Sequence, residues 1–170
     1  MRAWMTTLLL AMACELSPDT TCSEVATFVP NEGWLHVPDE LPVLYRHNPP
    51  ASGPHSGTWA RWQLYTEPMP RRHWVHNLEH GGVVLLHRPD APQDVIDALK
   101  AAYAAIPLDE KCEHTRALLT PDPELEVPVA AVAANHVLKA DRLDAETVKR
   151  FVEVCRGRAP EDVCTQGQRE

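Results

Sequence analysis

Apolar residues recur with a helical period in two parts of the chain. In residues 91–106 they are spaced three and four apart, at Val95, Ile96, Leu99, Ala102, Tyr103 and Ile106. In residues 144–155 a second apolar stripe follows Asp144, a residue type that caps helix N-termini. These two patterns predict the main helices of the protein, at about 92–106 and 144–156.

Short apolar runs predict strands before and between these helices. Residues 82–87 contain four consecutive aliphatic side chains, which is typical of a strand buried on both faces. A second strand is expected at 115–120, and residues 127–138 are compatible with a strand, although their alanines leave that assignment open. Weaker runs at 42–45 and 59–65 predict two further short strands. This order of elements predicts an α+β fold, in which a small mixed or antiparallel sheet packs against the two helices.

Prolines are frequent in the first half of the chain, so a long proline-rich loop region is expected before residue 82. Residues 48–55 contain three prolines and one glycine, which together make a rigid loop. Residues 71–80 allow two interpretations. A proline before them and two glycines after them suit a short helix. Trp74 and the apolar run that follows suit a strand instead.

The first residues have the features of a secretory leader. Residues 1–13 hold one positive charge, a small residue at the cleavage position and an apolar run. The run is shorter than the about 20 residues that cross a bilayer. Ala-Met-Ala-Cys at 11–14 resembles a bacterial lipoprotein signal, in which Cys14 carries the lipid, although Ala11 stands where leucine is preferred. We therefore expect an exported protein of the periplasm or cell surface, held at the membrane by a lipid anchor.

Behind this signal peptide we expect an extended lead-in at 14–32, a single globular domain at 33–156 and a polar tail at 157–170.

The formal net charge is −8, and the longest basic cluster is the pair Arg71-Arg72. A nucleic-acid partner is excluded because it needs a concentrated basic face. The acidic field attracts cations, although acidic surfaces more often serve solubility.

The cysteines support export. There are five, and four remain once Cys14 is assigned to the lipid, so that two disulfides are expected in an oxidising compartment. Three pairings of Cys22, Cys112, Cys155 and Cys164 stay open. A bond between Cys22 and Cys164 would join the two ends of the domain and leave Cys112 to pair with Cys155.

Histidine is the most conspicuous candidate for chemistry, with nine residues in the chain. His76 and His80 are four residues apart, a spacing that places both imidazoles on one face of either a helix or a strand. Two imidazoles on one face begin a transition-metal site, for which copper and zinc are the expected ions. His55, in the rigid loop, is predicted to be the third ligand, and His36 is the next candidate.

Glu79 has three interpretations. It is an extra ligand, or it orients an imidazole through a hydrogen bond. In the third, residues 76–80 match the His-x-x-Glu-His signature of inverted zinc peptidases, with Glu79 as the general base of a metal-dependent hydrolase. That class needs a long helix, and Gly81-Gly82 ends any helix here. We therefore favour a protein without catalytic activity, and a non-enzymatic interaction module of the cell envelope, with an unknown protein partner, remains a further alternative.

Two motifs resemble a known family. Pro-Pro-Ala-Ser-Gly-Pro-His at 49–55 and His-Asn-Leu-Glu-His-Gly-Gly at 76–82 are similar to the patterns of the bacterial domain-of-unknown-function family 3105. The sequence departs from the family at Ala51, where threonine is usual, and at Ser56, where an aromatic residue is usual. The resemblance implies an exported or membrane-anchored protein. It also implies that the histidines and Glu79 of the two motifs form one unit, but it implies no activity.

Overall fold

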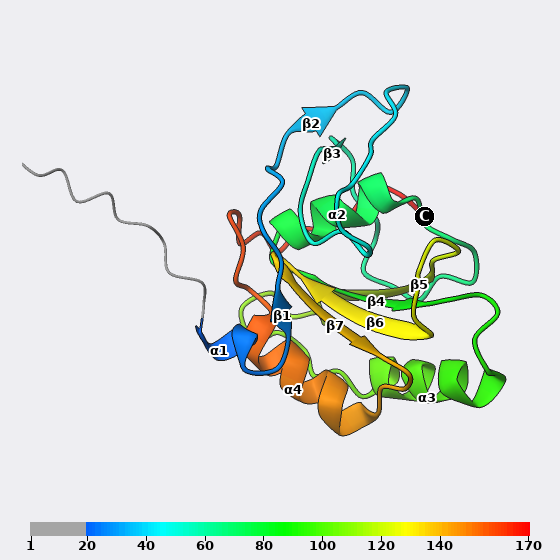
Figure 1. Cartoon of the computed structure of the whole chain (residues 1–170). Helices are drawn as coiled ribbons and strands as arrows, with labels where there is room; N and C mark the ends of the chain where they lie inside the picture. The colour runs from blue at the N-terminus through cyan, green and yellow to red at the C-terminus, as the bar shows by residue number, and fades with distance from the viewer. Residues whose placement is uncertain (1–19) are drawn as a thin grey trace, which may run out of the picture.

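A five-stranded mixed sheet is the centre of the computed structural model, which describes residues 20–170 (Figure 1). The strand order is β1-β7-β6-β4-β5. β4 pairs in parallel with β5 and antiparallel with β6, and β7 pairs antiparallel with both β6 and β1. The strand bounds are β1 Thr27–Phe28, β4 Val83–His87, β5 Ala117–Pro121, β6 Val129–Ala133 and β7 His136–Ala140.

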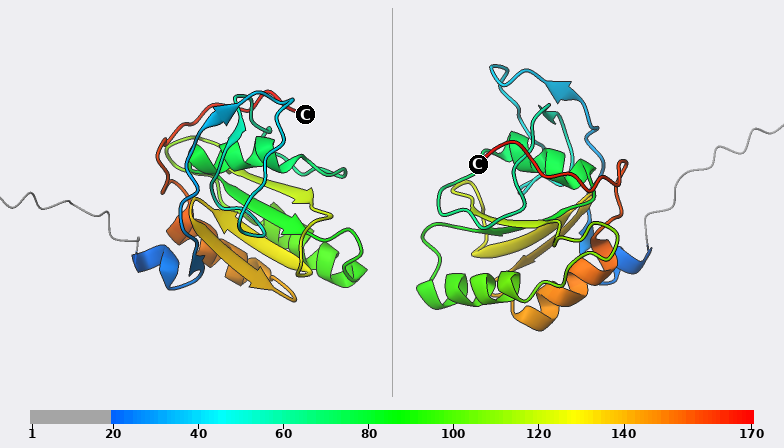
Figure 2. Two further views of the ribbon diagram at one scale, coloured as in Figure 1. Left: turned by 45° about the horizontal axis from the view of Figure 1, so that its top comes forward. Right: turned by 180° about the vertical axis from the view of Figure 1, so that it is seen from behind.

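Both faces of the sheet are covered. The helices α3 (Gln93–Ala104) and α4 (Ala145–Cys155) pack on one face, and α2 (Arg71–Glu79) packs on the other (Figures 1 and 2). Successive residues of β4 point to opposite faces, so that Leu85 joins the core under α3 and α4 whereas Leu86 joins the core under α2. This double coverage explains why β4 is an uninterrupted apolar run.

The predicted α+β class and both main helices are confirmed. Asp144 is the N-cap of α4, and its Oδ1 accepts a hydrogen bond from the backbone N–H of Thr147 at 2.8 Å. Residues 71–80, for which two interpretations were open, begin with the helix α2. Residues 127–138 fold into the hairpin of β6 and β7, with Asn135 in the left-handed region at φ 59°.

The two weaker strand predictions are wrong. Residues 42–45 contain no strand, and residues 59–65 form only isolated bridges, between Ala60 and Arg169 and between Leu64 and Leu119. Both segments are loops, and in 59–65 the backbone groups bond to side chains such as those of Asn77 and Gln168 and to single backbone groups.

The residues expected to flank the domain contact it closely. The lead-in contains α1 (Thr20–Ser23) and the edge strand β1. In the tail, the carbonyl of Arg169 accepts hydrogen bonds from the backbone of Arg61 at 2.9 Å and from the hydroxyl of Tyr65 at 3.0 Å.

The predicted signal peptide at 1–13 and Cys14 lie outside the described residues. Among residues 20–170, no helix has the length and apolar character needed to cross a membrane.

Two disulfides connect distant parts of the chain, and of the three pairings left open the one that joins Cys22 to Cys164 is not formed. Cys22 bonds to Cys155, and Cys112 bonds to Cys164. Cys22 pairs with Cys155 because α1 packs against α4. Cys164 lies instead near the loop that contains Cys112, where Lys111 pairs with Asp162. The two bonds support an oxidising, extracellular-type environment.

Candidate metal centre

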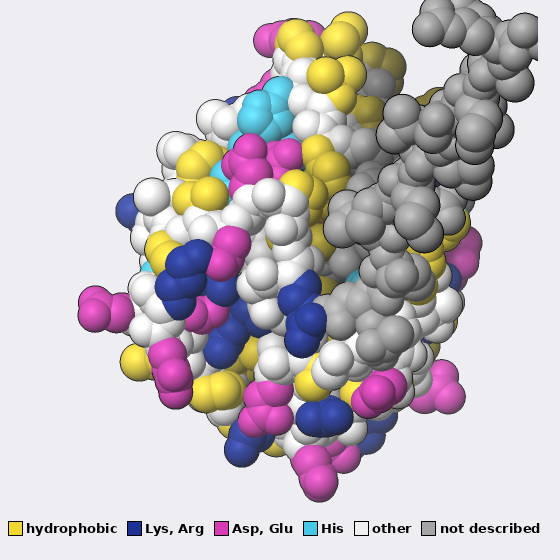
Figure 3. Space-filling view, turned by 90° about the vertical axis from the view of Figure 1, so that its left-hand side faces the viewer, with side chains coloured by type: hydrophobic (Ala, Val, Ile, Leu, Met, Phe, Trp, Pro, Cys, Tyr) yellow, Lys and Arg dark blue, Asp and Glu magenta, His cyan; other side chains and the backbone are white. Residues whose placement is uncertain are grey.

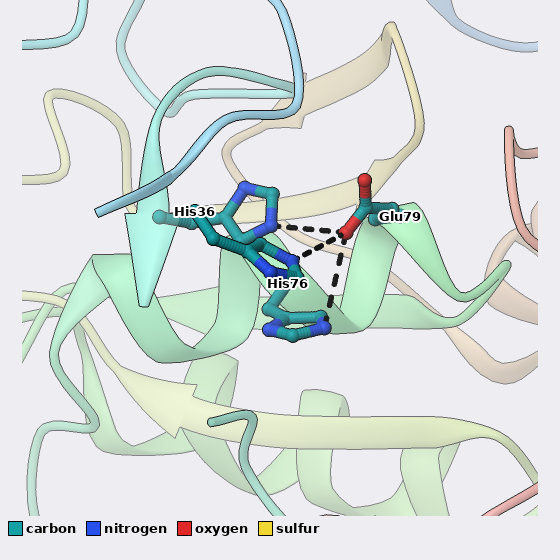
Figure 4. A group of neighbouring side chains, drawn as sticks. His36, His76 and Glu79 are labelled. Carbon is teal, nitrogen blue, oxygen red and sulfur yellow. Dashed lines mark hydrogen bonds and ion pairs between the residues drawn. The ribbon is translucent and has the colours of Figure 1, made fainter. Parts of the chain in front are cut away.

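Three segments on the α2 side of the sheet carry the site. β2 (His36–Val37) and β3 (His55–Ser56) form a small parallel sheet, whose register places His36 beside His55. β3 contacts α2. His76 and Glu79 lie three residues apart on α2, so that they share one helix face and point toward the two strands (Figure 4).

Three imidazoles surround one carboxylate oxygen. Glu79 Oε2 lies 3.0 Å from His55 Nε2, 3.2 Å from His36 Nε2 and 3.8 Å from His76 Nε2. The four donor atoms all lie within 4.8 Å of one another. Ligands bound about 2.1 Å from one ion lie roughly 3.0 to 4.2 Å apart, and the three distances from Glu79 Oε2 fall in this range. The group could therefore hold a metal.

The residues of the site are buried except for His36. His55 and His76 are 0% and 2% exposed, and Glu79 is buried as well. The side chain of His36 is 54% exposed. Figure 3 shows histidine at the surface near one end of the molecule, beside acidic side chains. An ion could reach the buried donors past His36, and negative charge would favour its approach.

Backbone carbonyls orient the two buried imidazoles. His55 Nδ1 donates to the carbonyl oxygen of Gly53 at 2.8 Å, and His76 Nδ1 donates to that of Ser56 at 2.6 Å. Both carbonyls belong to the end of the rigid proline loop and the strand that follows it. Metal-binding histidines are held in this way, because a proton on Nδ1 leaves the Nε2 lone pair for the ion.

His55 has an acceptor at each nitrogen. Its Nδ1 faces Gly53 O, and its Nε2 faces Glu79 Oε2. A neutral imidazole has one N–H and can satisfy only one of these contacts. Both contacts are favourable together when a metal ion stands between Nε2 and the carboxylate. Because two more Nε2 atoms converge on the same oxygen, this position suits a metal ion.

Burial keeps His76 in the neutral form that binds metals. Loss of hydration lowers the pKa of its imidazole to about 3, and the neighbouring His55 and His80 rings act in the same direction. The hydrogen bond to Ser56 opposes the shift and is outweighed. The Nε2 lone pair of His76 is therefore available throughout the neutral and mildly acidic range.

We expect the free energy of unfolding of the metal-free protein to fall as the pH drops from about 6.5 towards 3. In the unfolded chain His76 binds a proton near its ordinary pKa of 6.5, whereas the folded protein holds that pKa at about 3. Between these values the unfolded state binds more protons, so acid favours unfolding. Urea denaturation at several pH values would measure the slope. A His76→Asn variant should show a shallower slope, and equal slopes would contradict the prediction.

Not all of the predicted ligands converge. The structure brings His55 and His76 together, and it adds His36 and Glu79, the two secondary candidates. His80 lies beside this group rather than in it, with its Nε2 2.7 Å from His76 Nε2. Burial lowers the pKa of His80 as well. The remaining histidines have partners elsewhere: His73 with Thr58, His47 with Glu32, His87 with Arg88, His114 with Cys164, and His136 with Ala134 and Ser23.

The geometry does not favour the inverted zinc-peptidase arrangement. α2 has nine residues and ends at Glu79, with His80 as its C-cap. Glu79 Oε2 faces three imidazoles, which is the position expected of a metal ligand. A general base would lie next to a metal-bound water instead. A general base must remain free to accept a proton from that water.

Asn77 is a buried residue of the site that sequence reasoning missed. Its side chain accepts a hydrogen bond from the backbone N–H of Ala60 at 3.0 Å and donates one to the Ala60 carbonyl at 2.8 Å. It thereby holds the loop that carries Trp59, whose ring packs 4.9 Å from His76 and 4.6 Å from His80. Asn77 lies inside the His-Asn-Leu-Glu-His motif, and this position could have marked it as a residue of the site.

An Asn77→Ala variant should be destabilised by about 2 to 4 kcal/mol, because it leaves a buried N–H and a buried carbonyl of Ala60 without partners. Asn77→Asp should not recover this stability, since it buries a charge and places an oxygen against the Ala60 carbonyl, although it still accepts from the Ala60 N–H. Urea denaturation measures both changes. A loss below about 1 kcal/mol for the alanine variant would mean that the loop is held by other contacts.

No curated protein and no solved structure matches the chain. One family does match, over residues 36–168, which span β2 to the tail and include three of the four disulfide cysteines. The match includes all four residues of the metal centre. Since residues 36–168 fit the family described as "Protein of unknown function (DUF3105)", the chain belongs to that family.

Proposed function

We propose that this protein binds one transition-metal ion outside the cytoplasm, through His36, His55, His76 and Glu79. The observation that carries the proposal is the convergence of three Nε2 atoms on Glu79 Oε2, with two of the rings oriented by backbone carbonyls. Burying a carboxylate is unfavourable unless a cation compensates its charge.

The types of ligand atom in the site indicate which metal ion it would bind. Three imidazoles and one carboxylate suit zinc or copper(II), whereas calcium and magnesium prefer oxygen ligands alone. The four cysteines of the described domain are consumed in disulfides, so that thiolate ligands, which favour copper(I), are not available there. We therefore propose zinc or copper(II).

The cellular setting follows from the disulfides and the leader. Two disulfides fit an exported protein, and residues 11–14 fit a lipoprotein signal with Cys14 as the lipidated residue. A lipid at this position would tether the domain to a membrane, because few residues separate Cys14 from α1. The proposed role is metal binding at the cell envelope.

A titration tests the proposal. Oxidised protein is titrated with Cu²⁺ and with Zn²⁺, and uptake is followed by equilibrium dialysis and tryptophan fluorescence. We expect one equivalent to bind, and copper to quench fluorescence because Trp59 and Trp34 pack against His76 and His55. A His55→Ala/His76→Ala variant should take up none at this site. Uptake unchanged in that variant, or no uptake by the natural protein, would refute the proposal.

A further inference from the structure

We propose that His80 holds a small anionic ligand, or hydroxide, on the bound metal. This inference rests on the proposed metal site and goes beyond it, because it assigns an open coordination position and a residue that recognises what occupies it. The ligand would bind the ion directly and accept a hydrogen bond from His80 Nε2.

The hydrogen-bond network assigns the protons of the two adjacent rings. His76 donates its Nδ1–H to Ser56 O, so its Nε2 carries a lone pair. His80 Nε2 lies 2.7 Å from that atom, a distance that requires a proton between them. His80 therefore donates its Nε2–H to His76 Nε2 in the metal-free protein.

Metal binding removes the acceptor of this hydrogen bond. The ion takes the single in-plane lone pair of His76 Nε2, at about 2.0 to 2.1 Å. The His80 N–H is then a buried donor without a partner, an arrangement that folded proteins avoid. An anion on the metal next to His76 would restore the lost bond, because ligands on adjacent coordination positions lie about 3 Å apart.

The indole ring of Trp59 packs beside both histidines, 4.6 Å from His80 and 4.9 Å from His76. The indole N–H is buried and has no hydrogen-bonding partner within residues 20–170. The His80 N–H, a buried donor with no acceptor once the metal is bound, favours a negatively charged or strongly accepting ligand.

His80 is better placed to contact such a ligand than to bind the metal itself. Its Nε2 is closer to His76 Nε2 than two nitrogens bound to one ion would be, so direct ligation requires the ring to move. The ring packs against both Trp59 and His76, and it stacks on His76 at an interplanar angle of 26°. Ligation also requires the proton to move to Nδ1, which makes no hydrogen bond and lies 3.5 Å from the exposed Glu161 Oε2.

Azide binding to the cobalt-loaded protein tests this assignment. Co²⁺ replaces the natural ion, and azide is added while the visible spectrum of the metal is recorded. We expect a saturable spectral change in the natural protein. His80→Ala should still bind one Co²⁺ but should bind azide about 10- to 100-fold more weakly, because one hydrogen bond to an anion is lost. His80→Gln, which keeps an N–H donor, should recover part of the affinity.

The control is His47→Ala, which alters a partly exposed histidine paired with Glu32, outside the centre. It should leave both affinities unchanged. Loss of stoichiometric Co²⁺ binding in folded His80→Ala and His80→Gln would identify His80 as a ligand and overturn the inference. Azide affinity equal in natural protein and His80→Ala, or no azide binding to the loaded natural protein, would overturn it as well. Failure of the natural protein to bind Co²⁺ at all would instead refute the metal site.

Discussion

Replacing His76 by alanine is expected to lower the affinity for zinc or copper(II) by at least about 100-fold. Losing a residue that only orients a ligand costs about 10- to 100-fold, and a ligand itself should cost more. His76 is also the buried donor that is held in its neutral form, so no other residue of the group replaces it. His36→Ala should cost less, because His36 is half exposed and water can take its place.

His73→Ala is the matched control. His73 lies one turn before His76 on α2, is also buried and also donates from Nδ1 to a backbone carbonyl, that of Thr58. It is not among the four residues that converge. Competition with a fluorescent chelator measures each affinity. Equal losses in both variants would show that the effect comes from disturbing α2, and would remove the support for His76 as a ligand.

The part of the site on α2 could be predicted because its spacing is local. His76, Glu79 and His80 are three and four residues apart, so a helix presents all of them on one side. The sequence does not say which of Glu79 and His80 completes the site. That choice depends on where β3 lies against α2, since Glu79 faces His55 whereas His80 faces Trp59.

The contribution of His36 could not be derived from any local pattern. It depends on a parallel pairing of two two-residue strands that are separated by a long loop. Single hydrogen bonds set that register, from Gly53 N–H to Gly33 O and from His55 N–H to Leu35 O. Periodicity carries no information about pairings of this length. His36 was accordingly a secondary candidate, and the structure brings it into the group.

The fold was predictable where apolar periodicity is long and strong, as in α3, α4 and β4. It was not predictable where polar contacts decide the conformation. The segment 157–170 is polar, yet its Asp162 pairs with the buried Arg116, and Arg169 pairs with Asp39 in the loop after His36. These ion pairs attach a segment that has no apolar stripe. A sequence reading based on burial therefore assigns such a segment to a tail.

Removing the disulfide between Cys22 and Cys155 should destabilise the protein by about 5 kcal/mol, since the bond closes a 133-residue loop in the unfolded chain. The Cys112–Cys164 bond closes 52 residues, for which the same relation gives about 4 kcal/mol. Cys22→Ala/Cys155→Ala avoids burying hydroxyl groups, because both cysteines are almost fully buried. For a chain of this size the Tm should fall by about 10 to 20 °C.

Calorimetry of this double variant, with Cys112→Ala/Cys164→Ala as its comparison, measures the difference between the two bonds. The first variant should lose more stability, because it also releases α1 and the edge strand β1 from α4 and β7.

The metal centre should keep its affinity for the ion in the first variant at temperatures below its lowered Tm, since α1 and α4 lie on the opposite side of the sheet from α2 (Figure 1). A smaller loss in the first variant than in the second would contradict the loop-closure argument. Loss of metal affinity in the folded first variant would mean that the two faces of the sheet are coupled.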